Sequence, residues 1–263
     1  MSARPNNINH NNETGTMKRT FADWGGVIIA LILVVAVNWL ANWLPIGGQT
    51  TGQVSAKYSS LFTPAGFTFS IWGVIYLGLF IYAIAQSLPS QRDNPTLSQI
   101  GKYFILSCLF NSAWIFAWHL QYIAVSLLLI IGLLLSLIQI YRTIQHSDET
   151  LGPAITLPFS VYVGWVSVAT IANFSILQTA LDANNIGISA INWTLLKLAI
   201  AGIAGTSMLI IKKDIAYILV IGWAAYGISV KQVATPEVSG AAWTISLIAT
   251  GLAIFQFARA KLT

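Results

Sequence analysis

Residues 62–82 read FTPAGFTFSIWGVIYLGLFIY, and this stretch decides the fold. A loop signal at residues 63–66 gives way to an apolar run that continues to about residue 88, long enough for a helix to cross a bilayer. Together with the long loop before it, residues 45–65, the stretch predicts a ligand pocket at one membrane face. An aromatic belt at the membrane interface is the simpler alternative. The rings concerned lie in the first turns of the helix: Phe67, Phe69, Trp72 and Tyr76.

The composition indicates an integral membrane protein. The chain of 263 residues is 56% apolar and only 8% charged, whereas soluble domains carry about 25% charged residues. The net charge of +5 is scattered over short loops, so we expect a lipid bilayer and no nucleic acid as partner. The single cysteine, Cys108, excludes an intrachain disulfide.

Eight apolar runs predict an all-α, polytopic membrane helix bundle. The expected spans are at about 25–44, 66–88, 103–120, 121–144, 156–178, 195–212, 214–231 and 240–259. Residues 1–22 are polar and rich in asparagine, which is typical of a disordered tail. We divide the rest into a five-helix domain, residues 23–178, and an additional three-helix region, residues 179–263.

The distribution of the cations predicts the orientation. Eight spans place both termini on one side, and ten of the thirteen lysines and arginines lie on that side. The positive-inside rule therefore puts both termini in the cytoplasm and the 45–65 loop outside. The ten are Arg4, Lys18, Arg19, Arg92, Lys102, Arg142, Lys212, Lys213, Arg259 and Lys261.

Amides are the informative polar groups within the spans, because a polar side chain in hydrocarbon needs a partner. Asn38, Asn111 and Asn173 each lie in the outer half of a span under this orientation. No span holds a central Asp, Glu or Arg, which counts against ion-coupled transport. The asparagines could orient a ligand, or they could only bridge helices.

Large rings share helix faces with these amides. Asn111, Trp114 and Trp118 fall at i, i+3 and i+7, and Trp165 and Asn173 fall at i and i+8. We expect rings and amides to form one layer beneath the 45–65 loop, suited to a flat aromatic ligand. The candidate ligand-binding residues are Phe67, Trp72, Tyr76, Asn111, Trp114, Trp165, Asn173 and Asn38.

The sequence contains no common catalytic motif and no cluster typical of a metal site. His119 lies in a short turn between two spans, where we expect it near water. It is more typical of an interface residue than of a metal or haem ligand, because no partner ligand lies nearby in sequence. Lys197, near a helix end, is expected to extend to water.

Three segments resemble one family. They resemble helices two, three and five of the tryptophan-rich sensory protein family. In that order, they are Trp72-x-x-x-Tyr76 preceded by Pro-x-Gly-aromatic, Phe110-Asn111-x-x-Trp114, and Leu157-Pro158 followed by Trp165 and Asn173. This family is also called TspO/MBR or translocator protein. The resemblance covers about residues 25–178, so the chain would be an extended member with three further helices. Its departures are phenylalanines at two tryptophan positions, a leucine at a third and a serine at an acidic one: Phe62, Phe67, Leu177 and Ser126.

The resemblance implies a membrane receptor or sensor that binds flat hydrophobic ligands, namely tetrapyrroles such as haem or protoporphyrin, with sterols as a further candidate. Haem or another porphyrin would be bound as a ligand, and no other cofactor is expected. The resemblance also implies that the protein lies in a bacterial plasma membrane. It leaves open whether the protein forms a homodimer. A facilitative carrier of small hydrophobic molecules is the main alternative, and a membrane enzyme acting on lipid or porphyrin is another. The carrier predicts internal repeats and the enzyme predicts clustered ionisable groups, and neither is evident in the sequence.

Overall fold

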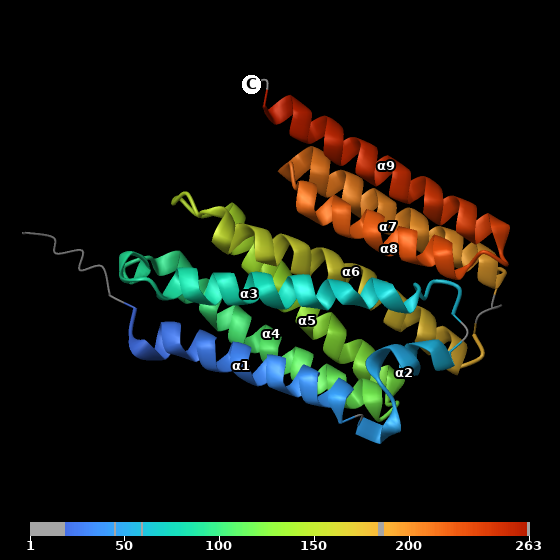
Figure 1. Ribbon diagram of the computed structural model, residues 1–263, viewed down its shortest axis with the longest axis horizontal. Helices are drawn as coiled ribbons and strands as arrows, with labels where there is room; N and C mark the ends of the chain where they lie inside the picture. The colour runs from blue at the N-terminus through green and yellow to red at the C-terminus, as the bar shows by residue number, and fades with distance from the viewer. Residues whose placement is uncertain (1–18, 45, 59, 184–186, 262–263) are drawn as a thin grey trace, which may run out of the picture.

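The computed structural model describes residues 19–44, 46–58, 60–183 and 187–261. Within these ranges the chain is helical and contains no strand, which confirms the all-α, polytopic prediction (Figure 1). Seven helical stretches are long and apolar enough to cross a membrane, and α8 is a shorter apolar helix of 17 residues. The α-helices are α1 (Phe21–Trp43), α2 (Thr51–Lys57), α3 (Ile71–Ser87), α4 (Pro95–His119), α5 (Ile123–Gln145), α6 (Pro153–Ala180), α7 (Ala190–Lys212), α8 (Ile215–Lys231) and α9 (Pro236–Ala260). Three 3-10 turns accompany them: η1 (Ile46–Gly48), η2 (Gly66–Ser70) and η3 (Pro89–Gln91).

Several helices start a few residues away from the expected position, and for α1 and α4 the caps explain the difference. The predicted tail, residues 1–22, lies mostly outside the described residues, but α1 already begins at Phe21. Its first turn is fixed by Asp23, whose carboxylate accepts a hydrogen bond from the backbone N–H of Thr20 at 2.8 Å. α4 begins at Pro95 rather than near residue 103, because the Asn94 side chain caps it and proline suits the first helical position.

The segment from 45 to 65, expected to be a loop throughout, contains the short helix α2. Thr50 caps this helix by accepting a hydrogen bond from the backbone N–H of Gln53, and the Gln53 side chain accepts one from the Thr50 N–H in return. This reciprocal pair is a capping box. The consequence for the site is that a folded element, not a free loop, covers one end of the bundle.

The helices form two groups that meet at α6. In Figure 1, α1, α3, α4, α5 and α6 form one group, and α7, α8 and α9 are stacked beside it. α8 makes most of the contact between them, against α6 and η2. The start of α1 and the end of α9 lie at the same end of the bundle, as an even number of crossings requires. The side of the membrane on which they lie, and the division into two regions at residue 179, remain predictions.

α8 packs closely on α6, and small residues allow this approach. A Cβ on Gly164 of α6 would lie 3.2 Å from Val220 of α8. One turn away, the Tyr217 hydroxyl lies 3.0 Å from that of Ser167. Close packing and interhelical hydrogen bonds are the forces that hold helices together in lipid, where no hydrophobic drive acts between them.

A buried lysine links α7 to α6, contrary to the expectation that it would extend to water. Lys197 is only 6% exposed, and its ammonium donates to Oε1 of Gln178 at 2.5 Å. The same ammonium lies 5.5 Å from the centre of the Phe174 ring, a distance that allows a cation–π contact. Gln178 and Phe174 on α6 therefore contact the ammonium where water was expected to do so.

Candidate ligand-binding site

Aromatic rings from α3, α4 and α6 meet around Trp72. The Trp72 ring is stacked with Tyr76 at 5.6 Å and with Trp114 at 6.5 Å between centroids, with interplanar angles of 23° and 29°. It meets Trp165 edge-on at 6.4 Å, and Phe69 meets Trp165 in the same way at 5.9 Å. These distances and angles are those that aromatic pairs prefer. The expected layer of rings is therefore present.

Two hollows lie on either side of these rings. A small, partly enclosed cavity of about 40 Å³ lies between α2, α4 and α6, with Phe69 and Trp72 in its lining. A groove of about 530 Å³ lies between α1 and α3, over α4. Thr51, Phe69, Trp72 and Trp114 line both of them. The cavity and the groove are therefore neighbouring parts of one site, which we call the ring-lined site.

A chain of buried hydrogen bonds connects three helices beside the groove. The Asn38 amide on α1 donates to Oδ1 of Asn111 on α4 at 2.7 Å, and the Asn111 amide donates to the Tyr162 hydroxyl on α6 at 2.8 Å. Asn111 is fully buried. Asn38 and Asn111 therefore bridge helices, which was the alternative to a role in orienting a ligand.

Asn173 on α6 makes a second set of bridges, in the wall of the enclosed cavity. Its Oδ1 accepts from Nε1 of Trp114 at 3.0 Å, and its amide donates to the Ser126 hydroxyl on α5 at 3.0 Å. Asn173 thus fixes the orientation of a ring that lines both hollows.

α2 covers the enclosed cavity and is attached to the end of α4. The backbone carbonyl of Thr51 accepts from Nε1 of Trp118 at 3.2 Å, and the Thr51 hydroxyl lies 3.0 Å from Nε2 of His119. Lys57, at the other end of α2, donates to Oε1 of Gln121 at 2.6 Å. The prediction that His119 lies near water is wrong: it is 1% exposed because α2 lies over it. No group of three or more potential metal ligands occurs among the described residues.

Two buried donors of the site have no protein partner. The indole N–H of Trp165 and the hydroxyl of Tyr76 make no hydrogen bond with any described residue. Trp165 faces the enclosed cavity, where it is 2% exposed, and Tyr76 lines the groove. A buried polar group without a partner is costly, so each is a position at which a water or a ligand acceptor would be stabilised.

The structure brings six of the eight sequence-predicted residues to the ring-lined site. Asn111 lies behind the wall, in the hydrogen-bonded chain, and Phe67 lies away from the hollows against α8. The residues in the linings are Trp72 and Trp114 in both hollows, Asn38 and Tyr76 in the groove, and Trp165 and Asn173 in the cavity.

Sequence reasoning missed several lining residues. Thr51 was placed in a loop, although the capping pattern at Thr50 and Gln53 could have located its helix. Trp39 and Trp43, a stacked pair with centroids 4.9 Å apart on α1, line the groove. Tryptophans at a helix end are typical of a membrane interface, so no local signal could have separated them from such anchors.

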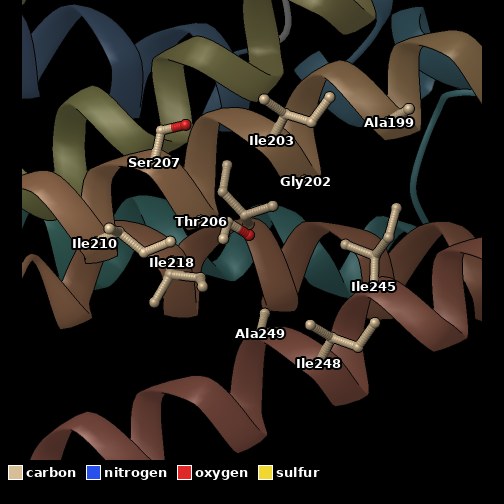
Figure 2. A pocket seen from close by; sticks show the side chains of 11 residues that line it. Ala199, Gly202, Ile203, Thr206, Ser207, Ile210, Ile218, Ile245, Ile248 and Ala249 are labelled. Carbon is tan, nitrogen blue, oxygen red and sulfur yellow. The ribbon is translucent and has the colours of Figure 1, made fainter.

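A second groove, of about 370 Å³, lies among α7, α8 and α9 and has a different character (Figure 2). We call it the aliphatic groove. Among the described residues that line it, the polar side chains are those of Thr206 and Ser207, and none is aromatic. Figure 2 shows isoleucines from the three helices around the small residues Gly202 and Ala249.

The fold and the ring-lined site define a class, namely a polytopic helical membrane protein with an aromatic-lined hollow at one end of its spanning helices. Within this class the chain belongs to the TspO family, because a family model described as TSPO-like protein matches residues 24–255. The match extends beyond residue 178 through α7 and α8 and most of α9, so it includes the three further helices. Neither a curated protein nor a solved structure matches the chain.

Proposed function

We propose that the protein is a membrane receptor or sensor for flat hydrophobic ligands, which bind in the ring-lined site. The observation that carries the proposal is the near-parallel pair of Trp72 and Trp114, which lines both hollows. Ring faces at this spacing favour stacking with a planar molecule. The groove of about 530 Å³ also falls within the range of roughly 300–1,000 Å³ typical of small-molecule sites.

Tetrapyrroles such as protoporphyrin or haem are the proposed ligands, with sterols as a second class. The body of such a ligand would lie in the groove, because the enclosed cavity of about 40 Å³ holds only a few waters. The unpartnered donors on Tyr76 and Trp165 favour a ligand with a hydrogen-bond acceptor directed at the rings. The asparagines already have protein partners, so they are proposed to hold the rings in place rather than to bind the ligand.

The lining favours binding over catalysis. Among the described residues that line the two hollows there is no Asp, Glu, His, Lys or Arg. Tyr76 is the ionisable group that they contain. General acid–base chemistry most often uses His, Asp, Glu or Lys, and the described lining residues include none of these.

The test is a titration of the purified protein in lipid nanodiscs with protoporphyrin and with haem, followed by tryptophan fluorescence. Saturable quenching with a defined stoichiometry is expected for the wild type and for Trp243→Phe, because Trp243 lies on α9 outside both hollows. Competition by a sterol would assign the second ligand class to the same site. Quenching that rises without saturation for all the ligands would contradict the proposal.

A further inference from the structure

The turn at the start of α3 is held by a helix about 155 residues further along the chain. The backbone N–H of Ala65, just before η2, donates to the carbonyl of Gly227 on α8 at 2.9 Å. Nε1 of Trp223, one turn earlier on α8, donates to the carbonyl of Thr68 within η2 at 2.9 Å. The Phe67 ring lies edge-on to Trp223 at 5.5 Å. Phe67, predicted from sequence as a ligand residue, thus contacts α8 instead.

The contact is closest at Gly227, where no side chain fits. A Cβ added there would lie 2.0 Å from Oγ1 of Thr68 and 2.9 Å from its Cγ2. Thr68 is fully buried, and its branched side chain is too restricted in rotation for both atoms to move away. A substitution at Gly227 must therefore displace the turn or the helix.

The same turn carries rings of the ligand site. Phe69 belongs to η2 and lines both hollows, and Trp72 follows at the second position of α3. Only Ser70 and Ile71 separate these two rings along the chain, so a displacement of η2 changes the position of Phe69 directly and of Trp72 through the helix start.

α8 also has a rigid support on the opposite wall of the site. It packs on α6, the helix of Trp165, through the close approach of Val220 to Gly164 and the hydroxyl pair of Tyr217 and Ser167. The carboxylate of Asp214 at its start accepts hydrogen bonds from Tyr141 and Ser160. α8 therefore fixes η2 relative to α6.

We propose that Trp223 and Gly227 are positioning residues for the ring-lined site: by holding η2 on α8 they set the distance between Phe69 and Trp72 on one wall and Trp165 on the other. The effect on ligand affinity rests on the function proposed above, whereas the effect on the turn does not. On this proposal the three C-terminal helices are part of the binding unit, although none of their residues lines the site.

The experiment compares full-length variants in nanodiscs by protoporphyrin titration and by amide hydrogen exchange over residues 66–70. Gly227→Ala is expected to weaken binding about fivefold or more, because overpacking forces backbone shifts, and to raise exchange in the turn. Trp223→Phe keeps a ring beside Phe67 but removes the hydrogen bond to Thr68, and should act in the same direction with a smaller effect. Gly222→Ala is the matched control, because a Cβ there approaches Ala249 of α9 at 3.1 Å rather than η2.

Rescue distinguishes positioning from a general loss of packing. Thr68→Ala removes the two atoms that a Cβ at Gly227 would strike most closely, so it should restore most of the affinity when combined with Gly227→Ala. Wild-type exchange and affinity in Gly227→Ala would overturn the proposal, and so would an equal loss of affinity in Gly222→Ala. If the wild type binds no porphyrin, the function proposed above fails, and the exchange measurement alone still decides whether α8 holds the turn.

Discussion

The ring-lined site and the aliphatic groove are hollows of similar size with different surroundings. The groove of the ring-lined site measures about 530 Å³, and the aliphatic groove measures about 370 Å³. Isoleucines and small residues around the second offer a ligand the same dispersion contacts that lipid tails offer. Stacked tryptophans and oriented hydrogen-bond donors around the first offer contacts that lipid does not. Volume therefore does not identify a binding site in a membrane protein, because only a lining that differs from hydrocarbon can select a ligand.

The orientation of the bundle in the membrane is the prediction with the largest expected effect, because the reporter outcome is all-or-none. Positive-inside bias predicts that the termini lie in the cytoplasm and that α2, with the ring-lined site beneath it, lies at the outer face. Reporter fusions at Gln53 and after Thr263 should report opposite sides, with the C-terminal one inside. Fusions that report the same side would refute this topology.

Removal of a stacked ring should produce the largest change in affinity. Trp114→Ala and Trp72→Ala each delete a ring that lines both parts of the site. Each should weaken protoporphyrin binding at least about tenfold, since stacking and lost apolar contact both contribute. Isothermal titration or fluorescence quenching in nanodiscs measures the change.

The control for these variants is Trp243→Phe on α9, which should leave the affinity within about twofold of wild type, since surface substitutions have small effects. If Trp72→Ala, Trp114→Ala, Trp165→Ala and Asn173→Leu all bind porphyrin as the wild type does, the site lies elsewhere and the family relationship concerns the fold alone.

Loss of the Asn173 bridge should affect stability before affinity. Asn173→Leu removes the hydrogen-bond acceptor of Nε1 of Trp114 and one hydrogen-bond partner of the Ser126 hydroxyl. Interhelical hydrogen bonds in membranes contribute about 0.6–2 kcal/mol, so the unfolding midpoint in detergent should fall by a few degrees. Ser126→Ala, which leaves the Trp114 bond intact, should cost less. A loss of affinity at unchanged stability would instead show that the amide binds the ligand.

A change in the aliphatic groove should have the smallest effect. A Cβ on Gly202 would meet Ile245 at ordinary contact distances of 3.7–3.8 Å, so Gly202→Ala fits without strain. Porphyrin affinity should stay within about twofold of wild type, as for other substitutions remote from the site. A tenfold loss would show that the two hollows are coupled or that the ligand occupies the second one.

Hydropathy predicted the spanning helices well, because a helix in hydrocarbon must be apolar along its length. The stripes of Asn111 with Trp114, and of Trp165 with Asn173, correctly brought rings and amides together, since spacing fixes which residues share a face. The capping box at Thr50 was readable as well, and it would have converted the expected loop into α2.

Other features depend on how the helices are rotated against one another, which no single segment determines. The bond between Asn38 and Asn111 joins α1 to α4 across 73 positions of sequence. Phe67 was misplaced because η2 packs against Trp223 of α8, a contact between segments far apart in the sequence. Burial of Lys197 required knowledge of Gln178 and Phe174 on the facing helix.

The groove runs between α1 and α3, two helices that cross the membrane, whereas α2, bonded to Trp118 of α4 and to Gln121 just after it, closes the end of the bundle. A hydrophobic ligand would therefore arrive sideways from the bilayer, and the bilayer would act as its solvent and its reservoir. The quantity that governs occupancy is then the mole fraction of ligand in lipid, set by partitioning, rather than its concentration in water. Dissociation constants expressed per volume of buffer should rise in proportion to the lipid or detergent present, while the same data expressed per mole of lipid should fall on one curve.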